Sequence, residues 1–194
     1  MLDQTEVIYC ICNEVLRALN ISDDLQCKMS TSEIMTFSIM SGMIYGCNYR
    51  LTRLMPLKHK YFPRILSHSQ LVRRIHKVPE RAWGMVFLTL QFFLKNKENN
   101  CFIVDSFPVK AYENHKSFRA KIFSSKEFHG YCASKKQYFF GIKVHMIVNS
   151  DGVPIEFAFA PGRESDIKNF RNLNLNFSMG DLILGDKAYT DYSF

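Results

Sequence analysis

The stretch Cys101-Phe-Ile-Val-Asp-Ser-Phe-Pro-Val109 has the composition of a β-strand and carries an acidic residue, Asp105, at its centre. A second apolar stretch, Asp181-Leu-Ile-Leu-Gly-Asp186, ends on another acid, Asp186. A carboxylate among apolar side chains loses hydration on folding, so it requires a cation, a hydrogen-bond partner or a raised pKa. Alternatively, each aspartate ends its strand and points into water. Two acidic strands in one chain favour a shared metal ion.

The residues between the two acidic strands predict a mixed sheet. The first strand is expected to end at Pro108, and residues 138–148 and 153–160 form two strands joined by the turn Asn149-Ser-Asp-Gly152. Ser165 caps a helix from about Asp166 to Asn174, which leads to the strand that carries Asp186. A strand–helix–strand connection favours parallel neighbouring strands, on which aspartates at matching heights hold Mg²⁺ between them.

The first half of the chain is helical in pattern. Apolar residues recur at helical spacing in residues 4–19, Ser30-Thr-Ser-Glu33 is a capping box that opens a second helix to Tyr45, and further helices are expected over 67–77 and 80–94. The polar segment 95–100 follows, and the hydrophobic period changes there from about 3.6 to 2. The sequence therefore predicts a helical domain over residues 1–97 and an α/β domain over 98–194.

Composition indicates a folded cytoplasmic protein. With 194 residues and 47% apolar content, the chain can bury a substantial core. The longest uncharged runs, 34–49 and 82–94, are shorter than the roughly 20 residues that span a bilayer, so no membrane partner is expected. The acidic N-terminus lacks the layout of a secretion signal. The six cysteines include no CxxC pair, which argues against a zinc site.

The net charge of +7 is unevenly distributed. Residues 1–49 carry 2 basic and 6 acidic side chains, whereas residues 50–81 carry 9 basic and 1 acidic. Such clustering suits a polyanion, although a charged stretch is equally a solvated surface. The helices 67–77 and 80–94 fit a helix-turn-helix-like DNA reader, with Arg73, Arg74 and Lys77 available for contact, so the helical domain 1–97 is predicted to bind DNA. The irregular tract 110–137 interleaves aromatic and basic residues, which either grip DNA or fix the tract to the domain surface.

Several short motifs, in this order, resemble those of DDE transposases of bacterial insertion sequences, closest to the insertion-sequence family numbered nine-eighty-two. The matching strings are Ser69-Gln-Leu-Val-Arg-Arg74, Val104-Asp-Ser-Phe-Pro108, Cys132-Ala-Ser-Lys-Lys-Gln-Tyr-Phe-Phe-Gly-Ile-Lys-Val-His145, Val153-Pro154, Gly162-Arg-Glu-Ser-Asp166 and Gly185-Asp-Lys-Ala-Tyr189. The resemblance implies a ribonuclease-H-like core, truncated here after its fourth strand, in which Asp105 and Asp186 are the first two acids of a catalytic triad.

The resemblance also implies the cofactor and the partners. Asp105 and Asp186 would bind Mg²⁺ or Mn²⁺, and the partners would be the terminal repeats of the element, the target DNA and further copies of the full-length chain. Asp166 is better explained by the start of its helix, Asp181 by a turn and Asp191 by a loop or helix start. The candidates for DNA contact are Arg73, Arg74, Lys77, Lys135, Lys136, Lys143, His145 and Lys187.

The third acid of that family is a glutamate on a helix well beyond the second aspartate, whereas this sequence stops eight residues after Asp186. If the 194 residues are the complete product, impaired strand transfer is expected; if they are a fragment, the parent should be active. Two alternatives remain. One is a non-catalytic DNA-binding transposase remnant that acts as an inhibitor, and the other is a ribonuclease-H-like nuclease.

Overall fold

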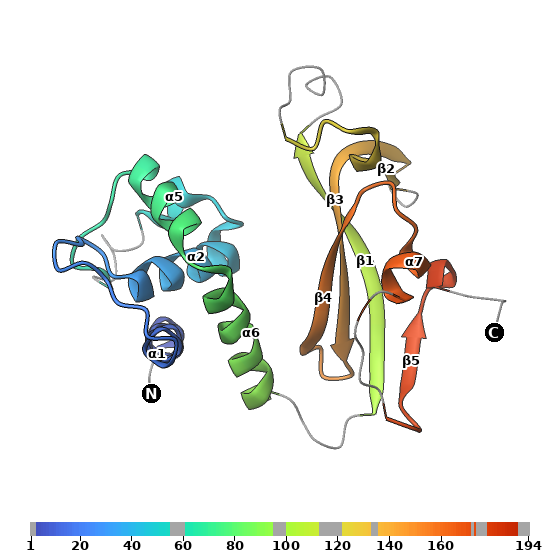
Figure 1. Ribbon diagram of the computed structural model, residues 1–194, viewed down its shortest axis with the longest axis horizontal. Coiled ribbons are helices and arrows are strands. Elements are labelled where there is room, and N and C mark those ends of the chain that lie inside the picture. The colour runs from blue at the N-terminus through green and yellow to red at the C-terminus, as the bar shows by residue number, and fades with distance from the viewer. Residues whose placement is uncertain are drawn as a thin grey trace. The chain divides into compact units, whose positions relative to one another are not determined.

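The computed structural model describes residues 3–54, 61–94, 100–112, 122–132, 136–171, 173 and 178–189. Contacts within the chain divide it into two compact units, residues 1–93 and 94–194. The first unit is helical and the second is built on a mixed β-sheet (Figure 1). Helices followed by a mixed sheet confirm the predicted fold class. Within the described residues, no helix is both long and apolar enough to cross a membrane.

The helical unit contains α1 (Gln4–Ala18), α2 (Thr31–Tyr45), α3 (Tyr49–Thr52), α5 (His68–Lys77) and α6 (Glu80–Leu94). The predicted capping box at the start of α2 is confirmed, because Ser30 Oγ accepts from the backbone N–H of Glu33 while Glu33 accepts from that of Ser30. A second box, between Ser67 and Gln70, opens α5. These reciprocal bonds satisfy backbone donors that a helix start otherwise leaves unpaired.

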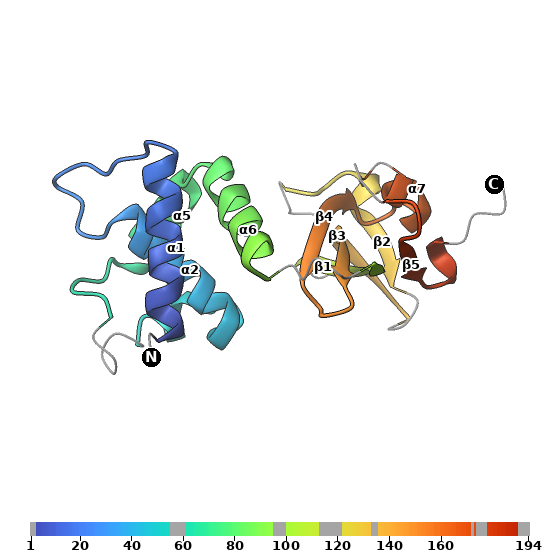
Figure 2. The same cartoon turned by 90° about the horizontal axis from the view of Figure 1, so that it is seen from below.

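Helix α2 is the centre of the helical unit. It packs along α1, as Figure 2 shows, and buries apolar side chains around most of its circumference. Its buried polar groups are paired, since Thr36 donates to the backbone carbonyl of Ser32 and Ser41 accepts from Thr52. The core of the unit is formed by Cys12, Val15, Leu16, Met29, Ile34, Met35, Phe37, Met40, Phe62, Leu66, Leu71, Val78, Ala82 and Val86.

The second unit contains β1 (Cys101–Tyr112), β2 (His129–Cys132), β3 (Gln137–Asn149), β4 (Pro154–Pro161) and β5 (Leu182–Gly185). The strand order is β2-β3-β1-β5, and β4 pairs with β3. β5 runs parallel to β1, and the other pairs are antiparallel. The β3–β4 turn forms as predicted, with the Asn149 side chain accepting from the backbone N–H groups of Asp151 and Val153.

The helix α7 (Asp166–Arg171) and the 3-10 turn η3 (Lys187–Tyr189) belong to the face of the sheet that carries the apolar core. This core contains Phe102 and Val104 from β1 and Ile147 from β3, with Phe170 of α7 and Tyr189 of η3 packed against it. Because side chains alternate along a strand, Ile103, Asp105 and Phe107 project from the opposite face.

Two details of the sheet differ from the prediction. β1 continues through Pro108 to Tyr112, because Pro108 pairs with Lys143 of β3, and β5 pairs with β1 only as far as Val104. In the described sheet, the other edge of β1 therefore has no strand partner at Pro108, where a residue without an N–H is tolerated. Among the described residues, the sheet also has five strands where four were predicted, since β2 lies within the tract predicted to be irregular.

The aromatic residues of that tract pack within the unit. Tyr112 stacks on Phe140 of β3 with ring centroids 5.6 Å apart, and Tyr131 contacts Tyr138 at 4.9 Å. Phe123 packs edge-on against Phe128 of the turn η2 (Lys126–Phe128). Of the two readings of the tract, these contacts match attachment to the domain surface.

Candidate active site at the ends of β1 and β5

The parallel register of β1 and β5 places the two acidic residues at the same height. Val104 pairs with Gly185, so Asp105 is the next residue of β1 and Asp186 is the first residue after β5. Gly185 has no side chain at a point where a Cβ would lie 2.9 Å from Cγ1 of Val104 and 3.3 Å from Cβ of Tyr189. The glycine therefore permits the close approach of η3 to β1, directly before Asp186.

Both carboxylates are exposed, which agrees with the alternative that each aspartate points into water and not with loss of hydration on folding. Asp105 lies on the face of β1 opposite the core, since Phe102 and Val104 are buried and the residues between them are not. Asp186 follows a strand whose four residues are all exposed. A dissolved cation therefore has direct access to both side chains.

Each carboxylate is oriented by a neighbouring backbone N–H. The N–H of Ser106 donates to Asp105 Oδ1 at 2.7 Å, and the N–H of Ala188 donates to Asp186 Oδ1 at 2.9 Å. Within the described residues, the second oxygen of each group has no hydrogen bond. Carboxylate oxygens on two adjacent strands suit Mg²⁺, which is commonly bound by one or two protein carboxylates, water and substrate phosphates. The described residues contain no set of three or more His, Cys, Asp and Glu side chains arranged to hold a metal.

A polar network lies on the core face of the sheet, next to these acids. Asp166 Oδ1 accepts from Ser106 Oγ at 3.1 Å and from Lys143 Nζ at 3.0 Å. Lys143 also donates to the backbone carbonyl of Glu164 at 3.0 Å. The side chains of Lys143 and Asp166 are 16% and 18% exposed, so the ion pair is largely shielded from water. This engagement makes Asp166 a partner of Lys143 rather than a simple helix-start residue.

The network continues to His145 and Tyr189. His145 is fully buried, and its Nδ1 lies 3.2 Å from the Tyr189 hydroxyl, while its Nε2 lies 3.8 Å from Asp166 Oδ1. Burial lowers the pKa of His145, an effect that Asp166 opposes and Lys143 reinforces. The pKa of Tyr189 is raised to about 12, mainly by burial and also by the charges of Asp166, Asp105 and Asp186, while Ser106 lowers it. The charges of both predicted site acids therefore act on the Tyr189 hydroxyl.

The sheet unit matches a family model over residues 96–194, half of the chain, and the model describes the transposase DDE domain. The chain belongs to this DDE transposase family. No curated protein and no solved structure matches it. The matched region of the transposase includes both Asp105 and Asp186.

Sequence reasoning missed two residues that the transposase brings to this site, Ser106 and Tyr189, and assigned a third, Asp166, to the start of its helix. Ser106 and Tyr189 are beside or near an acid in the chain, but their hydrogen bonds reach residues about 40 to 80 positions away. The sequence held one signal for this polar network. Polar residues alternate in Lys143-Val-His145, which places both polar side chains on one face of β3.

Among the predicted DNA contacts in the sheet unit of the transposase, Lys136 and Lys187 are exposed, and Lys187 directly follows Asp186. Lys135 lies outside the described residues. Lys143 is held by Asp166, and His145 lies in the interior rather than on an exposed strand face.

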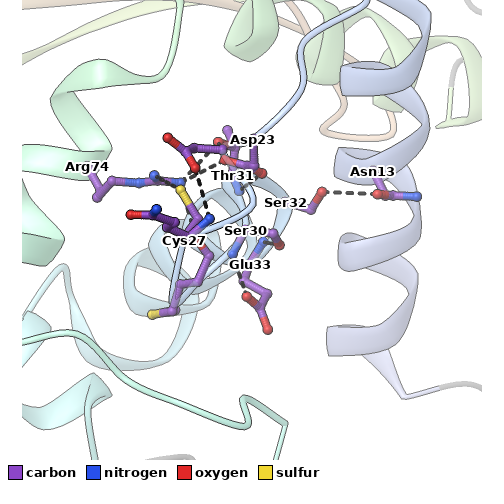
Figure 3. A network of polar contacts seen from close by, with 11 residues as sticks. Asn13, Asp23, Cys27, Ser30, Thr31, Ser32, Glu33 and Arg74 are labelled. Carbon is purple, nitrogen blue, oxygen red and sulfur yellow. Dashed lines mark hydrogen bonds and ion pairs between the residues drawn. The ribbon is translucent and has the colours of Figure 1, made fainter.

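In the helical unit of the transposase, Arg73 and Lys77 are exposed, but Arg74 is not available as predicted. Arg74 pairs with Asp23 at 2.9 Å and donates to the carbonyl of Met29, as part of the network in Figure 3. A surface hollow of about 300 Å³ lies beside this pair and is lined by Lys28, Met29, Leu66, Gln70, Arg73, Arg74 and Lys77.

Proposed function

We propose that this transposase cuts and joins DNA strands at the ends of an insertion sequence, of the family numbered nine-eighty-two, with Mg²⁺ or Mn²⁺ held by Asp105 and Asp186. The observation that carries the proposal is the parallel pairing of Val104 with Gly185. Asp105 directly follows the first of these residues in the chain and Asp186 directly follows the second. Membership of the DDE transposase family supports the reaction class.

The proposed roles follow from the surroundings of each acid. The backbone N–H groups of Ser106 and Ala188 orient one oxygen of each carboxylate and leave the other for a cation. Divalent ions in phosphodiester chemistry activate the attacking oxygen and stabilise the departing one. Lys187 extends the site with a positive charge next to Asp186, where it would bind a DNA phosphate.

The helical unit supplies a second proposed DNA surface. Lys28, Arg73 and Lys77 line one hollow, and within the described residues none of them has an acidic partner. Cations that converge without acidic neighbours repel one another, and a phosphate backbone relieves this repulsion as its counterions are released. Arg74 belongs to the same hollow, but its charge is already balanced by Asp23.

Catalysis is tested by incubating supercoiled plasmid DNA with the protein and Mg²⁺ or Mn²⁺. The variants are Asp105→Asn and Asp186→Asn, because asparagine keeps an oxygen for the backbone N–H and removes the charge. Glu127→Gln is the matched control, an exposed carboxylate of the same unit changed in the same way. Metal-dependent nicking by the wild type and the control, lost in both Asp variants, is expected.

Two results would contradict the proposed catalysis. Nicking that persists in either Asp→Asn variant would remove that residue from the site. A protein that shifts DNA in a gel and never nicks it would instead be a non-catalytic DNA binder. Preferential cleavage of RNA in an RNA–DNA hybrid would redirect the proposal to a ribonuclease-H-like nuclease.

DNA binding by the helical unit is tested with Arg73→Gln and Lys77→Gln, with Arg17→Gln as the control. Arg17 is exposed on α1 and pairs with Glu14, away from the hollow. Loss of one phosphate contact should reduce the slope of log affinity against log salt by about 0.9. Unchanged slopes for Arg73→Gln and Lys77→Gln would show that the hollow does not bind the DNA backbone.

A further inference from the structure

We propose that Tyr189 is the positioning residue for Asp186: by anchoring η3 to the buried side of the sheet, it fixes the carboxylate at the end of β5 and thereby sets the affinity for the divalent cation. The inference rests on the proposed cation site at Asp105 and Asp186. It concerns a residue that would never touch the ion or the DNA.

The strand before Asp186 is weakly anchored. β5 has four residues, all of them exposed, and in the described sheet it pairs only with β1. Leu182, Ile183 and Leu184 remain 36–55% exposed, so β5 buries its apolar surface only in part and depends strongly on backbone hydrogen bonds to one neighbour. The position of Asp186 depends accordingly on the segment that follows it.

That segment is a tight turn that ends on Tyr189. The backbone N–H of Tyr189 donates to the carbonyl of Asp186 at 3.1 Å, and the N–H of Ala188 donates to its carboxylate at 2.9 Å. Asp186 and Tyr189 therefore move as one short unit. The ring of Tyr189 packs edge-on against Phe170 of α7, with centroids 5.8 Å apart, and joins the apolar core of the sheet.

The hydroxyl of Tyr189 then fixes this unit to β3 and β1. It lies 3.2 Å from Nδ1 of the fully buried His145 of β3, and His145 is paired in register with Ser106 of β1, the residue after Asp105. The same network thus has one member beside Asp105 and another three residues after Asp186. One buried set of side chains therefore lies next to both exposed acids in the chain.

The chemistry of His145 indicates the direction of this bond. Nε2 has no hydrogen-bond partner among the described residues and faces the Asp166 carboxylate at 3.8 Å. A proton on Nε2 is attracted by that negative charge, whereas a lone pair there is repelled. Nδ1 is then unprotonated and accepts from the Tyr189 hydroxyl, the hydrogen-bond donor that a tyrosine offers at neutral pH.

The test measures Mn²⁺ binding to the full chain by the electron paramagnetic resonance signal of the free ion. Tyr189→Phe removes the hydroxyl and keeps the ring, and it should raise the dissociation constant about 10-fold, as the loss of outer-shell partners does at other metal sites. Tyr131→Phe is the matched control, an exposed tyrosine of β2, and should bind Mn²⁺ like the wild type.

A second pair of variants changes His145, the other partner in the hydrogen bond with the Tyr189 hydroxyl. His145→Asn keeps a polar acceptor near the position of Nδ1, whereas His145→Leu does not, so the asparagine variant should bind Mn²⁺ more tightly than the leucine variant. Thermal unfolding without metal accompanies each titration. A positioning role predicts weaker Mn²⁺ binding by Tyr189→Phe at temperatures where its unfolding curve shows the variant to be fully folded.

The outcomes separate this inference from the proposed site. If Asp105→Asn and Asp186→Asn abolish binding but Tyr189→Phe binds like the wild type, the positioning role is wrong and the cation site stands. If the two Asp variants bind Mn²⁺ as tightly as the wild type, the cation site is wrong and the inference ends with it. Equal affinities for His145→Asn and His145→Leu would also overturn the positioning role.

Discussion

Arg73 and Arg74 are adjacent residues of one helix with different predicted effects on stability. The side chains of Arg74 and Asp23 are only 25% and 26% exposed. A hydrogen bond to a charged group contributes about 1.5–3 kcal/mol when shielded, and an exposed ion pair contributes less than about 1 kcal/mol. The partly shielded Arg74 pair lies between these cases, so Arg74→Met should destabilise the helical unit by about 2 kcal/mol.

The assay is thermal unfolding followed by the helical circular dichroism signal. For a unit of this size, about 2 kcal/mol lowers Tm by about 10 °C. Arg73→Met is the control, because Arg73 is exposed and bonds only to the Ser69 carbonyl of its own helix within the described residues. Its change in stability should stay within about 0.5 kcal/mol. Equal Tm values for the two variants would refute the claim that Arg74 stabilises the helical unit.

The pair also predicts a pH dependence. Burial alone would raise the pKa of Asp23, but hydrogen bonds from Thr31 and Arg74 outweigh it and hold the pKa below the ordinary value of 3.8. A lowered carboxyl pKa stabilises the fold above the ordinary value, and this stabilisation is lost as the pH falls through the folded-state pKa. The difference between the wild type and Arg74→Met should therefore narrow below pH 3.8. A difference that stays constant down to pH 2 would contradict the role of the Asp23 charge.

Three further substitutions are predicted to change thermal unfolding. Gly84→Ala should stabilise α6 by about 0.5–1 kcal/mol, because alanine favours a helix and its Cβ would meet no atom within 4 Å; a lower Tm would contradict this. Gly185→Ala should destabilise by about 1–3 kcal/mol, since the new Cβ would lie 2.9 Å from Val104; an unchanged Tm would show that η3 moves freely. Lys143→Met should cost about 3 kcal/mol by leaving Asp166 shielded without a cation, and Asp166→Asn in the same chain should restore part of it.

The elements that sequence predicted best are those with local signals. The start of α2 is encoded within Ser30-Thr-Ser-Glu33, and the β3–β4 turn within Asn149-Ser-Asp-Gly152, so each could be located without knowledge of the fold. The continuation of β1 through Pro108 was missed because it depends on where β5 stops, which is a property of the sheet.

The exposure of Asp105 could not be predicted from its neighbours. Both faces of β1 carry apolar side chains, Phe102 and Val104 on one and Ile103 and Phe107 on the other, so alternation does not reveal which face is covered. The same limit applies to Tyr189, whose partners lie on β1 and β3 and are fixed only when the sheet has formed.

The capping boxes of the helical unit have a consequence for the order of folding. Ser30 with Glu33, and Ser67 with Gln70, stabilise helix starts through contacts three residues apart. The β1–β5 ladder instead joins residue 101 to residue 182, so closing it carries the entropy of a long loop. Local contacts form sooner than distant ones. Amides of α2 should thus gain protection in pulsed hydrogen exchange before those of β5, and synthesis on the ribosome, which delivers α2 first, would reinforce that sequence of events.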